Sequence, residues 1–181
     1  MRVFFSAVLV ACLSRQATGT EQLQAISASQ SSTLFYRGVK YLASKAIDGD
    51  LGTMAHTNCG SDEMWLKVNF EDSSSHSCFD YVRIVQGISG ANAYRMDGTE
   101  VYAAKSKTGE EQLCGTLEIS TVYSVAGQTY DISCPEEGLF CGKWNQIVLR
   151  QQKSGGCIHV LEVQAFGTLL GKQVLSRLLT P

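Results

Sequence analysis

The sequence predicts an all-β protein, an antiparallel sandwich or barrel of short strands. Three observations support this fold class. Strand-like segments recur along the chain, as at 64–70, where Leu66, Val68 and Phe70 occupy alternate positions and give the pattern of a half-buried strand. Turn-forming residues separate these segments at short intervals. No long stretch with helical periodicity interrupts them.

The strands that this pattern predicts follow one another along the chain. They cover residues 25–28, 64–70, 81–86, 100–104, 117–122, 129–133, 144–150 and 160–166. Polar or glycine-containing turns are expected at 71–76, 87–94 and 105–112. Between the first two strands, the apolar residues Leu34 and Phe35 are expected in a loop. They either fold back and become buried or stay exposed as a spike that enters a membrane or a partner.

The two ends of the chain differ from its middle part. Residues 1–19 resemble a secretory signal peptide, with Arg2 ahead of an apolar core and small residues before the cleavage site. Residues 20–167 are then expected to form one domain, large enough to bury a hydrophobic core. Residues 168–181 are expected to form a short helical tail with an apolar face. That tail either frays or packs on the sandwich, or it takes part in oligomerisation.

Cysteine content and charge restrict the function classes. Removal of residues 1–19 takes away Cys12 and leaves six of the seven cysteines. None forms a C-x-x-C pair, so disulfides in an oxidising compartment are expected rather than zinc or thioredoxin-like chemistry. The same removal takes Arg2 and Arg15 from the 15 basic residues, and the remaining 13 face 17 acidic ones, a net charge of −4. This acidity, without any Lys/Arg cluster, argues against nucleic acid as a partner.

An acidic turn at 45–50 is the clearest candidate for a metal site. Asp48 and Asp50 flank Gly49, whose conformational freedom lets the backbone curl. Carboxylate and carbonyl oxygens can then converge on a hard cation such as calcium. The alternative is an Asp-Gly turn that holds no metal.

Several segments, taken in order, resemble the discoidin-like superfamily, which includes the C-type domains of coagulation factors five and eight, and especially its F-type lectin (fucolectin) branch. These segments are Lys45-Ala46-Ile47-Asp48-Gly49-Asp50, His56-Thr57, Trp65-Leu66-Lys67-Val68-Asn69-Phe70, Arg95-Met96-Asp97-Gly98-Thr99-Glu100-Val101, Cys114 with Cys134, and Leu161-Glu162-Val163. The resemblance covers nearly all of 25–167. It implies a disulfide-stabilised jelly roll of about eight strands, with binding loops clustered at one end.

The resemblance implies a sugar site formed by His56, Arg95 and Gln86. In fucose-binding relatives a histidine and two arginines hold the sugar, and His56 and Arg95 fall on the histidine and the second arginine. The first arginine falls near Gln86, whose neutral amide forms weaker hydrogen bonds than a guanidinium. The adjacent cysteine pair of those relatives is also missing, with residues 88–93 in its place. We expect His56 and Arg95 to donate hydrogen bonds to sugar oxygens, and Tyr94 or Phe35 to pack on an apolar sugar face.

The resemblance also implies the calcium ligands and one disulfide. The ligands are the Lys45 carbonyl oxygen, Asp48, Asp50, Thr53 and Glu162. The implied disulfide joins Cys114 to Cys134. For the other cysteines we expect Cys59 with Cys157, which would clamp the loop that carries His56, and Cys78 with Cys141.

The leading hypothesis is therefore a secreted, calcium-dependent carbohydrate-binding domain that needs oligomers for avidity, because one sugar offers little contact area. The runner-up is a discoidin module that binds a phospholipid membrane or a cell-surface protein through Leu34 and Phe35. An adhesion role without a small ligand is a third reading. No enzyme is expected, because the sequence has no G-x-S-x-G, H-E-x-x-H or phosphate-binding glycine motif.

Overall fold

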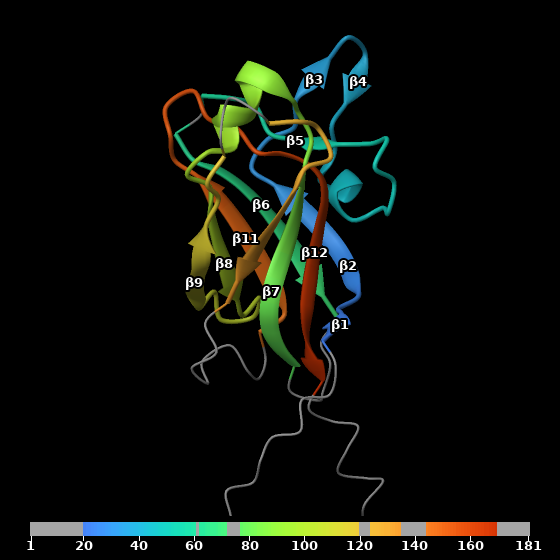
Figure 1. Cartoon of the computed structure of the whole chain (residues 1–181), viewed down its shortest axis with the longest axis vertical. Coiled ribbons are helices and arrows are strands. Elements are labelled where there is room, and N and C mark those ends of the chain that lie inside the picture. Colours follow the sequence, from blue (N-terminus) through green and yellow to red (C-terminus); the bar gives the residue numbers. More distant parts are fainter. Residues whose placement is uncertain (1–19, 61, 72–76, 120–123, 135–143, 170–181) are drawn as a thin grey trace, which may run out of the picture.

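Two five-stranded antiparallel sheets form the protein in the computed structural model, which describes residues 20–60, 62–71, 77–119, 124–134 and 144–169 (Figure 1). The strands of the first sheet are, in order, β1 (Glu21–Gln22), β12 (His159–Leu169), β7 (Ser77–Gln86) and β10 (Thr129–Ser133), with β5 (Ala55–His56) paired to β12 as well. Those of the second are β2 (Ala25–Gln30), β6 (Met64–Phe70), β11 (Gln146–Gln151), β8 (Glu100–Ala104) and β9 (Glu111–Thr116). The predicted all-β sandwich is confirmed.

The hydrophobic core lies between the two sheets. In β6, Met64, Leu66, Val68 and Phe70 are buried while the residues between them are half-exposed, which is the predicted alternation. The other sheet contributes buried residues such as Val82, Ile84, Val163 and Ala165. Burial of each large aliphatic side chain contributes about 1.5–3 kcal/mol. The ring of Phe70 meets that of Phe79 edge to face, with centroids 5.7 Å apart, so the two sheets are also joined by an aromatic pair.

Most predicted strands are confirmed; the one at 117–122 is wrong over 117–119, and its residues 120–122 lie outside the described residues. Residues 64–70, 100–104 and 129–133 match β6, β8 and β10. Residues 117–119 are not in a strand, and the edge strand β9 lies instead at Glu111–Thr116, inside and beyond the expected turn. Leu117 and Ile119 are buried from a loop, which explains their apolar character. Because β9 is an edge strand whose residues are mostly half-exposed, it lacks the apolar alternation that identifies a strand.

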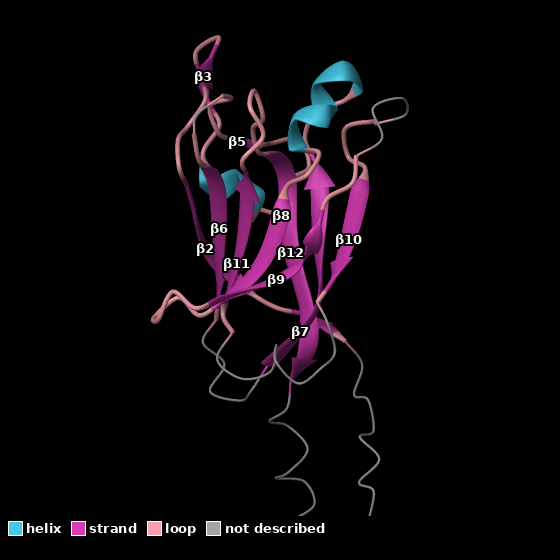
Figure 2. Cartoon of the chain, turned by 90° about the vertical axis from the view of Figure 1, so that its left-hand side faces the viewer, coloured by secondary structure: helices cyan, strands magenta, loops and turns pink. Residues whose placement is uncertain are grey.

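Two short 3-10 helices and one hairpin were not predicted. The helices are η1 (Ala43–Ala46) and η2 (Gly90–Met96), and the hairpin joins β3 (Phe35–Tyr36) to β4 (Val39–Lys40). All three lie with β5 at one end of the sandwich, which we call the loop end (Figures 1 and 2). At the opposite end, β1 pairs with the last residues of β12, as Glu21 lies beside Gly167.

Two disulfides among the described residues tie the sandwich together. Cys114–Cys134 joins β9 of one sheet to the residue after β10 of the other, and Cys59–Cys157 joins the segments after β5 and before β12. Both predicted pairings are confirmed. Closing a loop of about 100 residues, as the second does, stabilises the fold by roughly 4–5 kcal/mol in the chain-entropy account. The expected Cys78–Cys141 pair lies outside the described residues.

The predicted chain ends are only partly covered. β12 runs to Leu169, so residues 168 and 169 are in a strand and not in the helical tail expected from 168. The rest of that tail and the expected signal peptide lie outside the described residues. Within the described residues, no helix has the length and apolar character needed to span a bilayer.

Candidate ligand-binding site at the loop end

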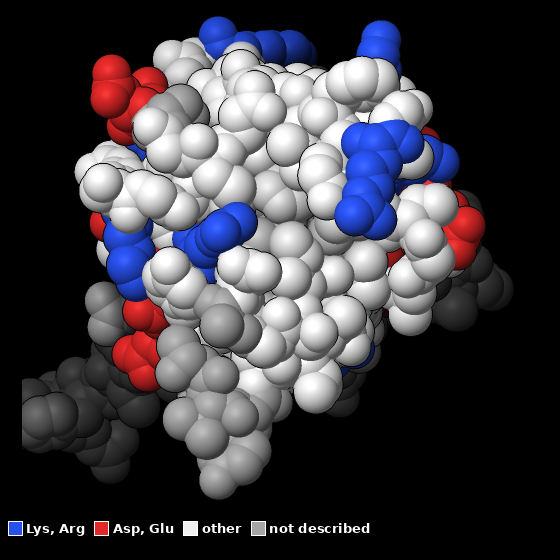
Figure 3. Space-filling view, turned by 90° about the horizontal axis from the view of Figure 1, so that it is seen from above, with Lys and Arg blue, Asp and Glu red and all other residues white. Residues whose placement is uncertain are grey.

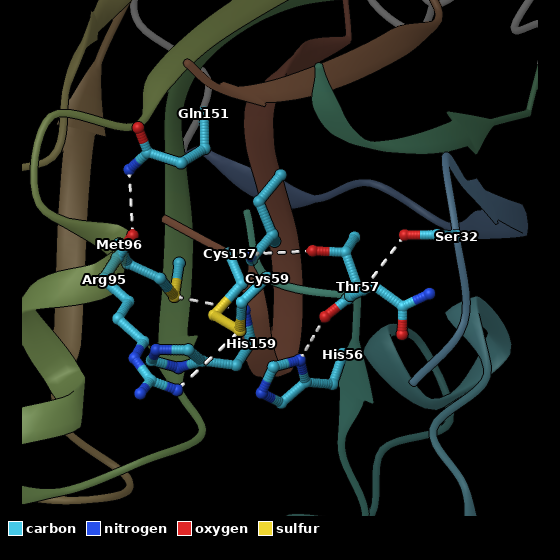
Figure 4. The surroundings of a disulfide bond; sticks show 11 residues. Ser32, His56, Thr57, Cys59, Arg95, Met96, Gln151, Cys157 and His159 are labelled. Atoms are coloured by element: carbon cyan, nitrogen blue, oxygen red, sulfur yellow. Dashed lines mark hydrogen bonds between the residues drawn. A yellow bond between two sulfur atoms is a disulfide. The ribbon is translucent and has the colours of Figure 1, made fainter. Parts of the chain in front are cut away.

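The loop end brings together segments far apart in the sequence. β5, η2 and the start of β12 meet there, beside the Cys59–Cys157 disulfide (Figures 1 and 4). Viewed from above, this end is mostly uncharged, with Lys and Arg side chains that stand apart from one another and with acidic groups near the rim (Figure 3). A face of this kind suits a neutral polar ligand better than a polyanion.

His56 is held firmly at this end. β5 pairs with β12, which sets His56 opposite His159. The His56 N–H donates to the Tyr41 carbonyl (3.2 Å), and its carbonyl accepts from the Leu34 N–H (2.9 Å). Only 4% of His56 is exposed, so a ligand can reach no more than the edge of the ring. The sequence predicted a histidine on a loop, whereas the structure places it in a strand under the surface.

The tautomer of His56 follows from one contact. Its Nδ1 lies 2.5 Å from the Thr57 carbonyl oxygen, which can only accept a hydrogen bond. Nδ1 therefore carries the proton, and Nε2 keeps a lone pair while the ring is neutral. Burial lowers the pKa of His56, the Thr57 carbonyl opposes this, and the Arg95 charge lowers it further. The expectation that His56 donates to a ligand is thus corrected, because its free nitrogen is an acceptor.

Arg95 belongs to η2, and its main chain is fixed from two sides. The Gln151 side-chain amide donates to the Arg95 carbonyl (3.1 Å), and the Cys157 N–H donates to the same oxygen (3.2 Å). The guanidinium is half-buried and its Nη1 lies 3.8 Å from Cys59 Sγ. No carboxylate among the described residues forms an ion pair with it, so N–H donors remain for a ligand. Figure 4 shows the guanidinium, the disulfide and the two imidazoles side by side.

His159 is the residue that sequence reasoning missed. Its ring centroid lies 5.5 Å from that of His56, and the residue is fully buried. Burial lowers the pKa of His159 to about 4, and the neighbouring His56 and Arg95 act in the same direction. A usable signal was present: His56 precedes Cys59 by three residues and Cys157 precedes His159 by two, so a Cys59–Cys157 bridge brings both histidines together.

Gln86 does not face this surface. It is fully buried, and its Oε1 accepts from the Ser124 hydroxyl (2.8 Å) and the Tyr130 hydroxyl (3.0 Å). Its Nε2 donates to the Ile88 carbonyl (2.8 Å). Because both ends of the amide have protein partners, the expected contact between Gln86 and a sugar is corrected. Gln86 fixes the loop that follows β7.

The acidic turn lies between η1 and β5, next to β12. Asp48 accepts hydrogen bonds from the Thr53 hydroxyl (2.8 Å to Oδ2), the Asp50 N–H (3.1 Å) and the Lys45 ammonium (3.0 Å). Burial raises the pKa of Asp48, but these bonds outweigh it and lower the pKa overall. The Gly49 N–H donates to Glu162 of β12. The turn and the last strand are therefore linked by a direct hydrogen bond.

Glu162 is unusual because it is a carboxylic acid that is 4% exposed. Burial raises its pKa, the Gly49 N–H opposes this, and the charge of Asp48 raises it again. Two carboxylates that repel each other across a turn are a favourable setting for a cation. The side-chain donors are all oxygens, which calcium prefers as ligands. The Lys45 ammonium already lies beside Asp48, where it shows that this carboxylate attracts a positive charge. The donor set thus fits calcium.

The spacing of the carboxylates fits a calcium ion less well than their chemistry does. Among the described residues, only His56, Cys59 and Cys157 bring three potential metal-ligand atoms of this kind within 4.8 Å of one another. Asp48, Asp50 and Glu162 form no such group. A calcium ion there would depend on main-chain and hydroxyl oxygens as well.

The β3–β4 hairpin projects beyond the site. Phe35 is 63% exposed, and Tyr36 and Val39 are exposed beside it, while Leu34 is half-buried. Of the two alternatives that the sequence left open, burial is therefore wrong for Phe35. Arg37, at the turn, adopts a positive φ of 51°.

A separate cavity of about 270 Å³ lies near η2. Its lining residues are Asp97, Gly98, Glu100, Arg150, Gln151, Gln152 and Lys153. Neither His56 nor Arg95 belongs to it. The two acidic and two basic side chains balance each other, so this cavity gives no clear preference for a charged ligand.

Comparisons with known proteins place the fold. No protein-family model matches the sequence, and no curated protein matches it. Among solved structures, a fucolectin from striped bass (Morone saxatilis) serum is similar, with a TM-score of 0.60 and 17% identity over 81% of this chain and 49% of that one. The chain thus spans about half the length of the bass lectin.

Two bacterial modules are similar over nearly their whole length. The family 32 carbohydrate-binding module of Clostridium perfringens NanJ, solved in complex with galactose, has a TM-score of 0.58 and 20% identity over 81% of this chain and 98% of that one. A fucose-binding module of Streptococcus pneumoniae has a TM-score of 0.53 and 18% identity over 77% and 89%.

The fold is thus the discoidin-like jelly roll that the sequence resemblance implied. It is the fold that the bass fucolectin and the bacterial carbohydrate-binding modules share.

Proposed function

We propose that the protein is a carbohydrate-binding module that holds a terminal sugar at the loop end. The observation that carries this proposal is Arg95, whose guanidinium lies beside the buried ring of His56 without a carboxylate partner among the described residues. The sugar-binding modules that share the fold support the same reading. They support a binding role rather than an enzymatic one.

The chemistry of the two groups is complementary. Arg95 donates hydrogen bonds from its planar fork to neighbouring sugar hydroxyls. The neutral His56 ring accepts from a hydroxyl at Nε2. Tyr94, which is 41% exposed on η2, offers an aromatic face for the apolar side of a sugar, with the Lys153 ammonium 5.3 Å from its ring centroid. Fucose and galactose are the first ligands to test, because they are the sugars named for the similar modules.

We also propose that calcium binds the acidic turn. Its ligands would be the Lys45 carbonyl oxygen, Asp48, Asp50, Thr53 and Glu162. The ion would supply positive charge between two carboxylates that repel each other. The five residues would hold the turn against β12 and so keep β5, with His56, in position.

The protein acts outside the cell in this proposal. The disulfides Cys59–Cys157 and Cys114–Cys134 and the similarity to a serum lectin support an extracellular site of action. A single shallow sugar contact is weak, so useful avidity would come from several copies of the module.

A glycan array probed with folded, calcium-loaded protein tests the proposal. We expect binding to fucosylated or galactosylated glycans by the natural sequence and a loss of more than tenfold in Arg95→Ala. Arg83→Ala is the matched control, because Arg83 lies on the strand β7 and pairs with Asp131. A blank array for the natural sequence, or equal binding by Arg95→Ala, would rule the proposal out.

The exposed hairpin favours a second candidate function, binding to a phospholipid surface. Phe35, Tyr36 and Val39 form an apolar tip, and Arg37 and Lys40 beside them suit anionic headgroups. Flotation with vesicles that contain phosphatidylserine tests it. Binding that persists in free sugar and disappears in Leu34→Ser/Phe35→Ser would support this function. If free sugar abolishes binding to the vesicles, the hairpin is not the membrane-binding element and this second function is wrong.

A further inference from the structure

Four potential zinc ligands gather around the Cys59–Cys157 bridge. A nitrogen of His56 and the sulfurs of Cys59 and Cys157 lie within 4.8 Å of one another. His159 is not one of these three, but its ring lies beside them, with its centroid 5.5 Å from that of His56. Two thiolates and two imidazoles are a common ligand set for structural zinc. The sulfurs are joined in a disulfide here, so the set becomes available only after reduction.

The surroundings of His159 independently indicate that a ligand is missing from this cluster. The residue is fully buried, and neither ring nitrogen has a hydrogen-bond partner of good geometry among the described residues. The main chains of His159 itself and of Asn92 lie near the ring and oppose the fall in its pKa. A buried imidazole without a partner is destabilising, because it has lost its hydrogen bonds to water. A metal ion would remove that cost, because it takes the lone pair of one nitrogen.

His56 already has the surroundings of a metal-binding histidine. Its Nδ1–H donates to the Thr57 carbonyl, which leaves the Nε2 lone pair for a ligand. A hydrogen bond from the second nitrogen to a carbonyl is what orients most zinc-bound histidines.

Cys59 gives a reductant access to the bridge. It is exposed, whereas Cys157 is fully buried. The Arg95 guanidinium, with Nη1 3.8 Å from Cys59 Sγ, stabilises a thiolate at that sulfur. A reductant therefore attacks Cys59, Cys157 leaves as the thiolate, and Cys59 becomes a reactive thiolate once it is free.

We propose that reduction of the Cys59–Cys157 disulfide converts this cluster into a zinc site formed by His56, Cys59, Cys157 and His159. A dithiol gives two electrons and two protons to the S–S bond, becomes a disulfide itself, and leaves two cysteine thiols. When Zn²⁺ binds, each thiol releases its proton to solvent and each sulfur donates a lone pair. The two thiolates balance the charge of the ion, so Arg95 can stay beside it. The inference does not rest on glycan binding.

Cobalt(II) titration of the full chain tests this inference, with reduction by a phosphine under nitrogen. The reduced protein should give the visible absorption of tetrahedral cobalt and a thiolate charge-transfer band, and zinc should displace both. The oxidised protein should give neither. His56→Ala and His159→Ala should each lose the tetrahedral spectrum. The double variant Cys114→Ser/Cys134→Ser is the matched control and should keep it, because that bridge belongs to no such cluster among the described residues.

Melting curves supply a second readout. Zinc should raise the melting temperature of the reduced protein, because it binds only the folded cluster. Three results would overturn the inference: a reduced protein without the tetrahedral spectrum, a spectrum that persists in Cys59→Ser/Cys157→Ser, or a reduced chain that stays unfolded with zinc. The second result would assign the metal to other thiols.

Discussion

His56 and His159 lie opposite each other on paired strands, with ring centroids 5.5 Å apart, both buried and both beside the guanidinium of Arg95. Charge on either ring would add to that of Arg95 inside a poorly solvated cluster. The site is therefore built to hold both imidazoles neutral. This relationship makes the stability of the fold sensitive to pH.

The first prediction concerns that pH dependence. The pKa of His159 is about 4 in the folded protein and near 6.5 when unfolded, so the unfolded chain binds more protons between these values. Its contribution to stability is complete above about pH 6.5 and falls by up to about 3 kcal/mol as the pH drops towards 4. The lowered pKa of His56 acts in the same sense. Urea unfolding at pH 7.5 and pH 5 measures the effect.

His159→Asn is the variant for that experiment. It removes the titrating group, so the loss of stability between pH 7.5 and pH 5 should shrink. His76→Asn serves as the comparison, because it changes another histidine of the same sequence. An equal pH response in the natural sequence and His159→Asn would show that His159 is not the responsible group.

The second prediction concerns calcium and Glu162. Calcium should raise the melting temperature of the natural sequence and a chelator should lower it, because an ion that binds only the folded state stabilises it. In Glu162→Gln the amide oxygen still accepts from the Gly49 N–H, so the fold persists, but the calcium shift should disappear. Asp131→Asn, which changes an acidic residue on β10, should keep the shift. If neither calcium nor a chelator changes the melting temperature, the proposed calcium site is wrong.

The third prediction concerns Gln86. Its buried amide accepts hydrogen bonds from the Ser124 and Tyr130 hydroxyls and donates one to the Ile88 carbonyl. Gln86→Ala therefore leaves these polar groups without that partner. We expect a loss of about 1–3 kcal/mol in the free energy of unfolding. Gln24→Ala is the control, because Gln24 is exposed and its side-chain amide donates to the carbonyl of the adjacent Ala25. A Gln86→Ala protein of natural stability that fails to bind glycan would instead restore Gln86 to the sugar site.

The fourth prediction concerns Gly49. Its φ of +73° lies in the left-handed region, where a residue with a Cβ is strained. Gly49→Ala should cost about 1 kcal/mol, because nothing crowds the new methyl group and only the backbone strain counts. Comparing Gly49→Ala with the natural sequence in the presence of a chelator separates backbone strain from loss of calcium, because neither protein then holds the ion. Equal stabilities for Gly49→Ala and the natural sequence would mean that the turn relaxes.

The sequence made the sheets predictable wherever one face is buried. Leu66, Val68 and Phe70 alternate because β6 has a core side and a solvent side, and such alternation can be read directly. Prediction from alternation failed at β9, because its half-exposed edge residues show no alternation. It also misled at Leu117, which is buried from a loop. The 3-10 helix η2 was also missed, because its stability comes from hydrogen bonds to distant residues such as Gln151.

The candidate site was predictable only in part. The bridge between Cys59 and Cys157 could be anticipated, and it brings its histidine neighbours together. The burial of His56 could not, because it depends on the packing of Tyr41 and His159 around the ring. Gln86 was misplaced for a similar reason, since its partners Ser124 and Tyr130 come from a separate part of the chain.

The pairing of β1 with the far end of β12 determines where the domain can be immobilised or fused to another protein. Glu21 and Gly167 are neighbours at the pole that points away from His56 and Arg95. A tether or a fused partner joined at either residue would hang from the base of the sandwich. Beads or sensor chips loaded in this way would hold every copy with its loops turned towards the sample.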